Sequence, residues 1–247
     1  MAIFYDPLQP EGIPNPALGL GRYVYHDDRS KAYPFTAPAP VPCTCGCPHC
    51  CKKDSSIIAS ILWEPVIPAL NQGSLGSCTG MSMAHLLASP SAGRAPLMLS
   101  VDERLAIDIY SGGTRLDDIP GTYPPVDTGC SGLGVMKYAR SRGWVSGYRH
   151  AFSLDQVLLA LQTTPMLFGL IWRRDMYSPA EDGLVSYTGT NVGGHEVVLI
   201  GCDVDSKTLM FRNSWGPNWG VSGNFRMTYA DFASALADRG DATIPIW

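Results

Sequence analysis

The feature that most constrains this chain is a single cysteine placed where a glycine-containing loop gives way to a helical pattern. Residues 71–88 read NQGSLGSCTGMSMAHLLA, and Cys78 separates the polar half from the small, apolar half. A helix N-terminus favours the thiolate form of such a cysteine. Gln72 precedes Cys78 on the same loop, so its amide can fold back toward the sulfur. The stretch therefore predicts a nucleophile, Cys78, and a donor for a developing oxyanion, Gln72.

Two later segments carry a histidine and an asparagine in glycine-rich or tryptophan-rich surroundings. They are GGHEVVLIG at residues 193–201 and NSWGPNWG at residues 213–220. His195 follows Cys78 by 117 residues, and Asn213 follows it by 135. Together with the loop before Cys78, these motifs and their order resemble the papain-like cysteine peptidases, which place the later residues about 130–150 positions downstream. The resemblance covers about residues 60–230, and it suggests that the chain is a divergent member of bacterial or phage type.

The resemblance implies a mechanism and a fold. His195 would pair with the Cys78 thiolate and later protonate the leaving amine, and Asn213 would orient the imidazole. Trp215 would cover that contact, and Gln72 with the Cys78 backbone N–H would form the oxyanion hole. The implied fold is α+β with two lobes: a helical left lobe, an antiparallel β-barrel-like right lobe, and the active-site cleft between them.

The residues expected to contact substrate flank these motifs. Residues 128–133 resemble the family's glycine-containing strand that hydrogen-bonds the substrate backbone, which makes Gly132 and Leu133 candidates. Gly194 and Trp215 are candidates beside His195 and Asn213. Glu196 stands where the family more often has a small residue, and a carboxylate there would favour a basic substrate side chain.

Two cysteine positions depart from the family pattern. The partner cysteine usual in the nucleophile loop is replaced by Leu75, so Cys130 is expected to lack its customary disulfide.

Each candidate also has a structural interpretation. Cys78 could be a buried structural cysteine, because free cysteine is among the most buried residue types. His195 could be a core histidine, although the two preceding glycines favour a site of close approach. Asn213 could be a turn residue. His85 lies about two helical turns beyond Cys78, so we interpret it as a core histidine and not as the base.

Composition excludes several classes of protein. The chain has 247 residues, of which 45% are hydrophobic and 16% charged, so it can bury a substantial core. A net charge of −4, without a basic stripe, gives no reason to expect nucleic-acid binding. No apolar run approaches the roughly 20 residues that span a bilayer, and residues 1–10 lack a secretory signal pattern. We therefore expect a protein with no membrane partner that is cytoplasmic as synthesised.

The chain divides into an arm and a domain. Residues 1–60 form an irregular arm rich in proline and cysteine, which could be a removable pro-segment or a belt packed on the domain. Residues 61–247 form the peptidase-like domain. The arm is similar to papain-like proteins of actinobacteria and their phages, so the protein could be phage-encoded and act in the host cell or the virion.

A cluster of thiols within the arm is a candidate metal site. Its members are Cys43, Cys45, Cys47, Cys50, Cys51 and His49. Soft ligands at these separations could hold a structural zinc ion. The alternative is a loose, partly oxidised arm, because a second CxxC pair at zinc-finger distance is absent. Catalysis of the predicted kind requires no cofactor.

Periodicity and turn residues predict the remaining elements. Helices are expected at residues 78–87, 100–110 (with Ser100 as N-cap), 135–142, 154–161 and 231–238. Strands are expected at 166–172, 197–201, 208–212 and 225–229, and residues 243–247 are expected to be a tail.

Three functions compete. The first is a cysteine endopeptidase acting on peptide or protein substrates. The second is a lysin-type peptidase acting on peptidoglycan peptides. The third is a non-catalytic binding module with the papain fold. The sequence gives no oligomeric state.

Overall fold

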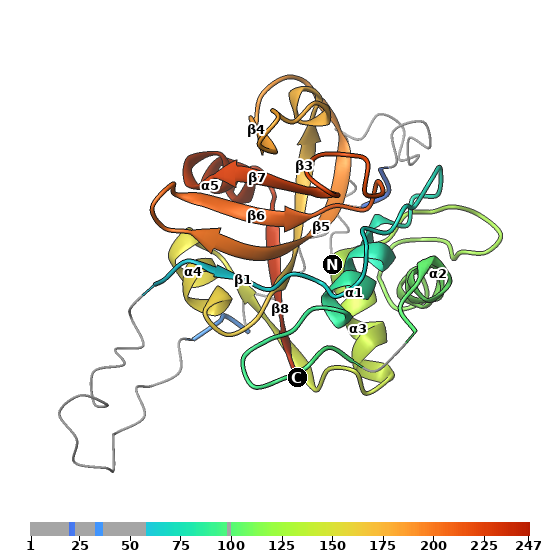
Figure 1. Cartoon of the computed structure of the whole chain (residues 1–247). Helices are drawn as coiled ribbons and strands as arrows, with labels where there is room; N and C mark the ends of the chain where they lie inside the picture. The colour runs from blue at the N-terminus through green and yellow to red at the C-terminus, as the bar shows by residue number, and fades with distance from the viewer. Residues whose placement is uncertain (1–19, 23–32, 37–57, 98–99) are drawn as a thin grey trace, which may run out of the picture.

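The computed structural model describes residues 20–22, 33–36, 58–97 and 100–247 (Figure 1). Most of the predicted arm lies outside these residues, so the division at residue 60 stays a prediction. The helices are α1 (Cys78–Leu87), α2 (Glu103–Gly113), α3 (Gly132–Ser141), α4 (Leu154–Leu161), the 3₁₀ turn η4 (Arg174–Tyr177) and α5 (Tyr229–Ala237). The strands are β1 (Ile61–Leu62), β2 (Gly147–Ala151), β3 (Met166–Arg173), β4 (Leu184–Val185), β5 (Asn191–Asp203), β6 (Thr208–Arg212), β7 (Asn224–Thr228) and β8 (Asp241–Ile246).

Within the described residues, the strands form one sheet in the order β2-β8-β3-β5-β6-β7-β4, with β1 added to β5. The pairs are antiparallel except β4 with β7, which is parallel. The α+β class is confirmed, and the sheet is open and mixed. Strand β5 is buried along nearly its whole length, as expected of a central strand that is covered on both faces.

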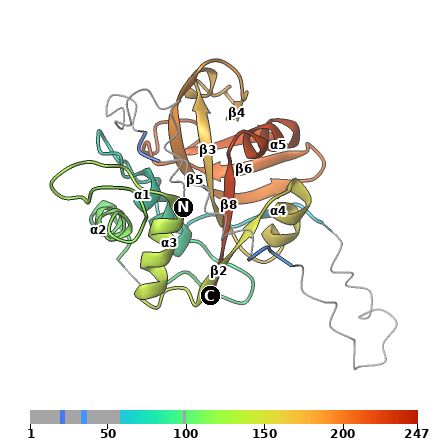
Figure 2. The ribbon, with the colours of Figure 1, turned by 180° about the vertical axis from the view of Figure 1, so that it is seen from behind.

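The sheet separates two hydrophobic cores. Successive side chains of a strand point to opposite faces, and β3 follows this rule. Leu167 packs with the helices α1, α2 and α3, whereas Phe168 and Leu170 pack with α4 and α5. In both ribbon views α1–α3 lie to one side of the sheet and α4 and α5 to the other (Figures 1 and 2). Of the catalytic candidates, Cys78 begins α1 and His195 lies on β5, while Gln72 and Asn213 lie on loops.

Side chains that accept hydrogen bonds from the first turn determine where several helices begin. Ser153 caps α4 and Thr228 caps α5. The N-cap of α2 is Asp102, whose carboxylate accepts from the Leu105 amide at 2.9 Å; the predicted cap, Ser100, was wrong. Ser131 caps α3 in the same way, so this helix begins three residues before the predicted start.

The segment expected to be a tail is a strand. Residues 241–246 form β8, which lies between β2 and β3, and β2 itself was not predicted. Pro245 made residues 243–247 look unlike a strand, because proline is rare inside strands. It pairs with Tyr148 of β2, whereas the pairing with β3 involves only residues 241–243, so no neighbour on that side requires an N–H from Pro245.

A search for membrane spans among the described helices finds none that is both long and apolar enough to cross a bilayer.

Candidate active site

Cys78 is the first residue of α1 and is fully buried. The loop before it ends at Ser77, whose side chain makes no capping hydrogen bond. Burial raises the pKa of the Cys78 thiol to about 12, although hydrogen bonds from the backbone of Glu196 and Gly21 lower it. In this arrangement the thiol is therefore protonated, and the predicted thiolate would need a more polar or hydrated environment.

His195 and Asn213 are brought together by neighbouring strands. His195 lies on β5, and Asn213 directly follows β6. The His195 Nε2 lies 2.7 Å from Asn213 Oδ1, and this oxygen also accepts from the Ser214 amide at 2.8 Å. Because the amide oxygen can only accept, Nε2 carries the proton. The basic nitrogen is then Nδ1, which is buried and makes no hydrogen bond with the part of the chain that the structure describes.

The backbone of β5 links this pair to Cys78, the predicted nucleophile. The N–H that hydrogen-bonds toward the Cys78 sulfur belongs to Glu196, the residue that follows His195. Burial lowers the pKa of His195 to about 4, against the hydrogen bond with Asn213 that raises it. The arrangement thus holds a neutral thiol and a neutral imidazole whose basic nitrogen is available to accept a proton.

Aromatic rings enclose the imidazole. Trp215 stacks on His195 with ring centroids 4.9 Å apart, and Trp172 meets the same ring edge-on at 5.0 Å. Tyr177 stacks on Trp215 at 5.3 Å. Trp215 was predicted to cover the histidine. Trp172 and Tyr177 were not singled out, because an aromatic residue in or after an apolar strand is indistinguishable from ordinary core.

Gln72, the predicted oxyanion donor, forms hydrogen bonds that connect its own loop to the loop after Asn213. The Gln72 side chain is buried, with Oε1 accepting from Ser214 Oγ at 2.6 Å and Nε2 donating to the Leu75 carbonyl at 2.8 Å. The Gln72 backbone N–H donates to the Ser214 carbonyl at 3.0 Å. The loop of the nucleophile is therefore fixed to the residue that follows Asn213. The amide retains a second N–H, and its role as oxyanion donor stays a prediction.

Two of the substrate-binding candidates are placed differently from the prediction. Gly132 and Leu133 are the first residues of α3 and do not form a strand. It is Cys130, just before α3, that makes a strand-like bridge, and its partner is Arg22. The physical reason is the Ser131 cap, which starts the helix immediately after this bridge. Cys130 is a free, buried thiol, as the loss of its partner at position 75 predicted.

Two further candidates, Gly194 and Glu196, also contact residue 22. The Gly194 carbonyl accepts from the Arg22 backbone N–H at 3.1 Å. The Glu196 carboxylate is fully buried and pairs with the Arg22 guanidinium, at 3.1 Å between Oε2 and Nε. His85 is buried as predicted, and its Nε2 accepts from the Leu70 amide at 3.0 Å.

The predicted metal ligands, Cys43, Cys45, Cys47, Cys50, Cys51 and His49, lie outside the described residues, so a zinc site there stays a prediction. Among the residues that are described, no group of three or more histidine, cysteine or acidic side chains could hold a metal ion.

Comparison with known proteins relates this geometry to a family. The sequence model of the papain family cysteine proteases matches residues 153–239. An uncharacterized peptidase C1-like protein of Acanthamoeba polyphaga mimivirus is 33% identical over 201 residues, which cover 65% of this chain and 64% of the viral protein. Mexicain of Jacaratia mexicana is 25% identical over 193 residues, covering 69% of this chain and 88% of mexicain. The chain thus spans less than two thirds of the viral relative.

Solved structures agree on the fold. The crystal structure of xylellain, a cysteine protease from Xylella fastidiosa, superposes with a TM-score of 0.67 over 92% of this chain and 96% of xylellain, at 16% sequence identity. At that identity the likeness concerns the fold alone. With the family match over residues 153–239 and the order of the cysteine, histidine and asparagine, it relates this chain to the papain-like cysteine peptidases, whose fold it shares.

Proposed function

We propose that this chain hydrolyses peptide bonds by nucleophilic attack of the Cys78 sulfur. The observation that carries the proposal is the His195–Asn213 contact of 2.7 Å, which fixes the imidazole tautomer and leaves Nδ1 as the base. Xylellain is a cysteine protease of the same fold and mexicain is a relative by sequence, and the general assignment as a cysteine peptidase rests on such relatives. The assignment of individual catalytic residues is the finer part of this proposal.

The reaction begins with proton transfer from the thiol to His195 Nδ1, which gives a thiolate–imidazolium pair. The thiolate attacks the substrate carbonyl, and the free N–H of Gln72 with the Cys78 backbone N–H stabilises the oxyanion. The imidazolium then protonates the leaving amine as the C–N bond breaks, which leaves a thioester on Cys78. Water, deprotonated by His195, hydrolyses the thioester and restores the thiol.

Asn213 and the surrounding rings keep this imidazole in position. The Asn213 oxygen can stabilise the imidazolium through Nε2–H, while the Ser214 amide prevents the side chain from presenting its NH₂ group instead. The stacked Trp215 and edge-on Trp172 exclude water from that hydrogen bond. In a dry environment the hydrogen bond is stronger than in water.

The test compares hydrolysis of denatured casein and of a quenched-fluorescent peptide library by three proteins: wild type, Cys78→Ala and Cys202→Ser. Cys202 is a buried thiol on β5 outside the site, so its conservative substitution controls for loss of a cysteine as such. We expect Cys78→Ala to lower the rate by at least about 1,000-fold and Cys202→Ser to retain it. Equal rates for wild type and Cys78→Ala would refute the proposal.

The same proteins separate the alternatives. A binding module without catalysis would show no hydrolysis and no covalent labelling of Cys78 by an epoxide thiol inhibitor. A lysin-type peptidase would leave casein intact and reduce the turbidity of purified cell walls in a Cys78-dependent way.

A further inference from the structure

A short stretch of the N-terminal region lies at the junction between the helices and the sheet. The Arg22 backbone N–H donates to the Gly194 carbonyl on β5 at 3.1 Å. The Gly21 carbonyl accepts from the Cys130 backbone N–H, just before α3, at 3.0 Å. Residues 20–22 therefore bond to both parts of the fold through their backbone, as an extended peptide would.

This stretch also lies against the nucleophile. A Cβ on Gly21 would be 2.0 Å from the Gly76 carbonyl oxygen, so the backbone at position 21 presses directly on the loop before Cys78. The Gly21 backbone contributes a hydrogen bond that acts on the Cys78 sulfur. If Cys78 attacks a substrate carbonyl as proposed, the substrate backbone would compete with residues 20–22 for this place.

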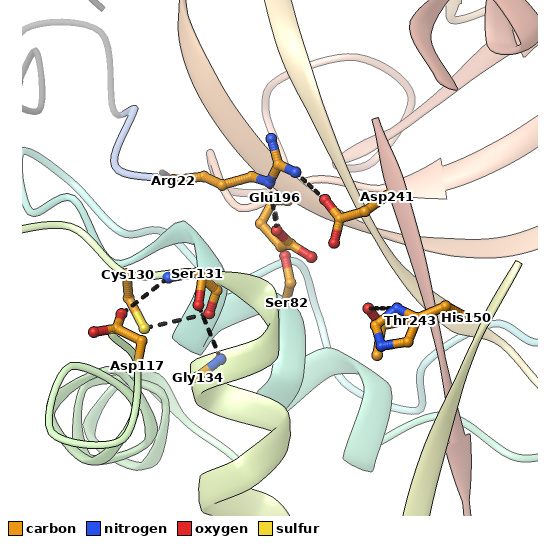
Figure 3. A network of polar contacts seen from close by, with 10 residues as sticks. All are labelled: Arg22, Ser82, Asp117, Cys130, Ser131, Gly134, His150, Glu196, Asp241 and Thr243. Atoms are coloured by element: carbon orange, nitrogen blue, oxygen red, sulfur yellow. Dashed lines mark hydrogen bonds and ion pairs between the residues drawn. The ribbon is translucent and has the colours of Figure 1, made fainter. Parts of the chain in front are cut away.

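The side chain of Arg22 enters a buried site with two carboxylates. Arg22 is 2% exposed, and its Nε lies 3.1 Å from Glu196 Oε2. Its Nη2 pairs with the carboxylate of Asp241, at the start of β8. Figure 3 shows the guanidinium between the Glu196 and Asp241 side chains. A planar guanidinium can bond two separate carboxylates at once, which a single ammonium group does less well.

Two glycines leave space for this ion pair, Gly169 for the guanidinium and Gly132 for the Glu196 carboxylate. Gly169, on β3, pairs with both Glu196 and Asp241, and a Cβ there would lie 2.0 Å from Arg22 Nε. Gly132 begins α3, and a Cβ there would lie 2.5 Å from Glu196 Oε1. We call the set Glu196, Asp241, Gly132 and Gly169 the guanidinium site.

The two carboxylates of the site favour a cationic occupant. A fully buried carboxylate is costly unless a counter-ion pairs with it. Among the described residues, Arg22 is the cation that forms an ion pair with Glu196. Burial raises the pKa of Glu196 to about 7 even though Arg22 lowers it, so the ionised form is only just stable with the guanidinium present. When residues 20–22 leave, Glu196 either takes up a proton or pairs with another cation.

Resting on the proposed function, we infer that the guanidinium site is a specificity site for an arginine side chain of the substrate, and that Arg22 occupies it in competition with that substrate. The substrate class is thus a peptide that carries arginine at the position facing Glu196 and Asp241. A solely structural interpretation would make Arg22 a fixed ion pair whose site no other ligand enters.

The test measures binding, not turnover, so it does not depend on the proposed chemistry. All proteins carry Cys78→Ala. Three peptides differ at one position, which holds arginine, its neutral isostere citrulline, or norleucine. Calorimetry with Arg22→Ala should show the arginine peptide binding at least about tenfold more tightly than the citrulline peptide. Adding Glu196→Gln should remove most of that preference, and the protein with Arg22 intact should bind all three more weakly.

A second measurement covers the case in which Arg22→Ala is too unstable to titrate. Millimolar methylguanidinium should raise the melting temperature of Arg22→Ala, and methylammonium at equal concentration should do so less. The protein with Arg22 intact should respond to neither. Equal affinity for the arginine and citrulline peptides, together with no effect of methylguanidinium, would overturn the inference. Such a result would leave Cys78-dependent hydrolysis standing, whereas an arginine preference without hydrolysis would refute only the proposed function.

Discussion

Single residues in this molecule have protonation states that their positions on the chain do not reveal. A cysteine at a helix N-terminus and a histidine later in the chain predict a charged pair, yet burial favours the neutral form of both Cys78 and His195. The motifs located Cys78, His195 and Asn213, because those residues lie in short, distinctive local patterns. They did not reveal Arg22 and Asp241, because these meet Glu196 only through sheet pairing and the path of residues 20–22.

His85 gives a prediction about pH at this scale. Burial lowers its pKa to about 3, below the ordinary 6.5, while its Nε2 accepts from the Leu70 amide. Between these values the unfolded chain binds a proton that the folded chain does not, so stability is present above pH 6.5 and is lost as the pH falls. The expected contribution of this residue is a loss of about 2 kcal/mol between pH 7 and pH 5.

The measurement is urea unfolding of wild type and His85→Gln at both pH values. Glutamine can still accept from Leu70 but does not titrate. His195 adds a loss of the same sign, because its pKa is also lowered, and Glu196 adds the opposite sign, because its pKa is raised. Both remain in the variant, so the difference between the two proteins isolates His85. Equal losses in the two proteins would contradict the assignment of His85 as a buried neutral histidine.

At the scale of elements, the helices and strands with a sustained hydrophobic pattern were predicted correctly. Strands that form only by pairing with a distant segment were missed. The helix at residues 78–87 and the strand at residues 208–212 match the structure, since each has a sustained apolar pattern. The strands β2 and β8 were missed, because neither has an alternating or sustained apolar pattern and each is defined by its pairing with the other. Their pairing joins residues almost a hundred positions apart, which no local pattern records.

Gly169 on β3 and Gly147 on β2 provide a matched pair of glycine substitutions. Gly169→Ala would place a Cβ 2.0 Å from the Arg22 guanidinium, whereas Gly147→Ala would place one 3.5 Å from Ile246, an ordinary contact. We expect Gly169→Ala to lower the free energy of unfolding by about 1–3 kcal/mol through overpacking. Gly147→Ala should change it by no more than about 0.5 kcal/mol. Chemical denaturation measures both, and similar effects of the two substitutions would show that the guanidinium is not held where the structure places it.

For the whole molecule, the helical part and the sheet meet at a junction that residues 20–22 occupy. The fold class could be predicted because three motifs fixed the family resemblance. The occupant of the junction could not, because residues 20–22 lie in a proline-interrupted region with no periodicity. What holds them is a set of backbone hydrogen bonds and a buried ion pair, and neither depends on a repeating pattern.

This arrangement predicts how accessible the nucleophile is. Cys78 has no exposed surface, and Gly21 lies against the loop before it, so alkylation should require residues 20–22 to move away. Arg22→Ala removes the ion pairs that hold them and should increase the rate of Cys78 alkylation by iodoacetamide at least about tenfold. Peptide-resolved mass spectrometry follows each thiol separately. The rate for Cys202, buried on β5, should not change; an equal increase at both cysteines would indicate general unfolding instead.

The position of β8 has a consequence for biosynthesis. Residues 241–246 form the strand that joins β2 to β3, and Asp241 supplies one of the two carboxylates around Arg22. A nascent chain on the ribosome therefore carries its cysteine, histidine and asparagine long before it can close the sheet that positions them. We therefore expect Cys78, His195 and Asn213 to reach their observed arrangement only after residue 246 has left the ribosomal exit tunnel.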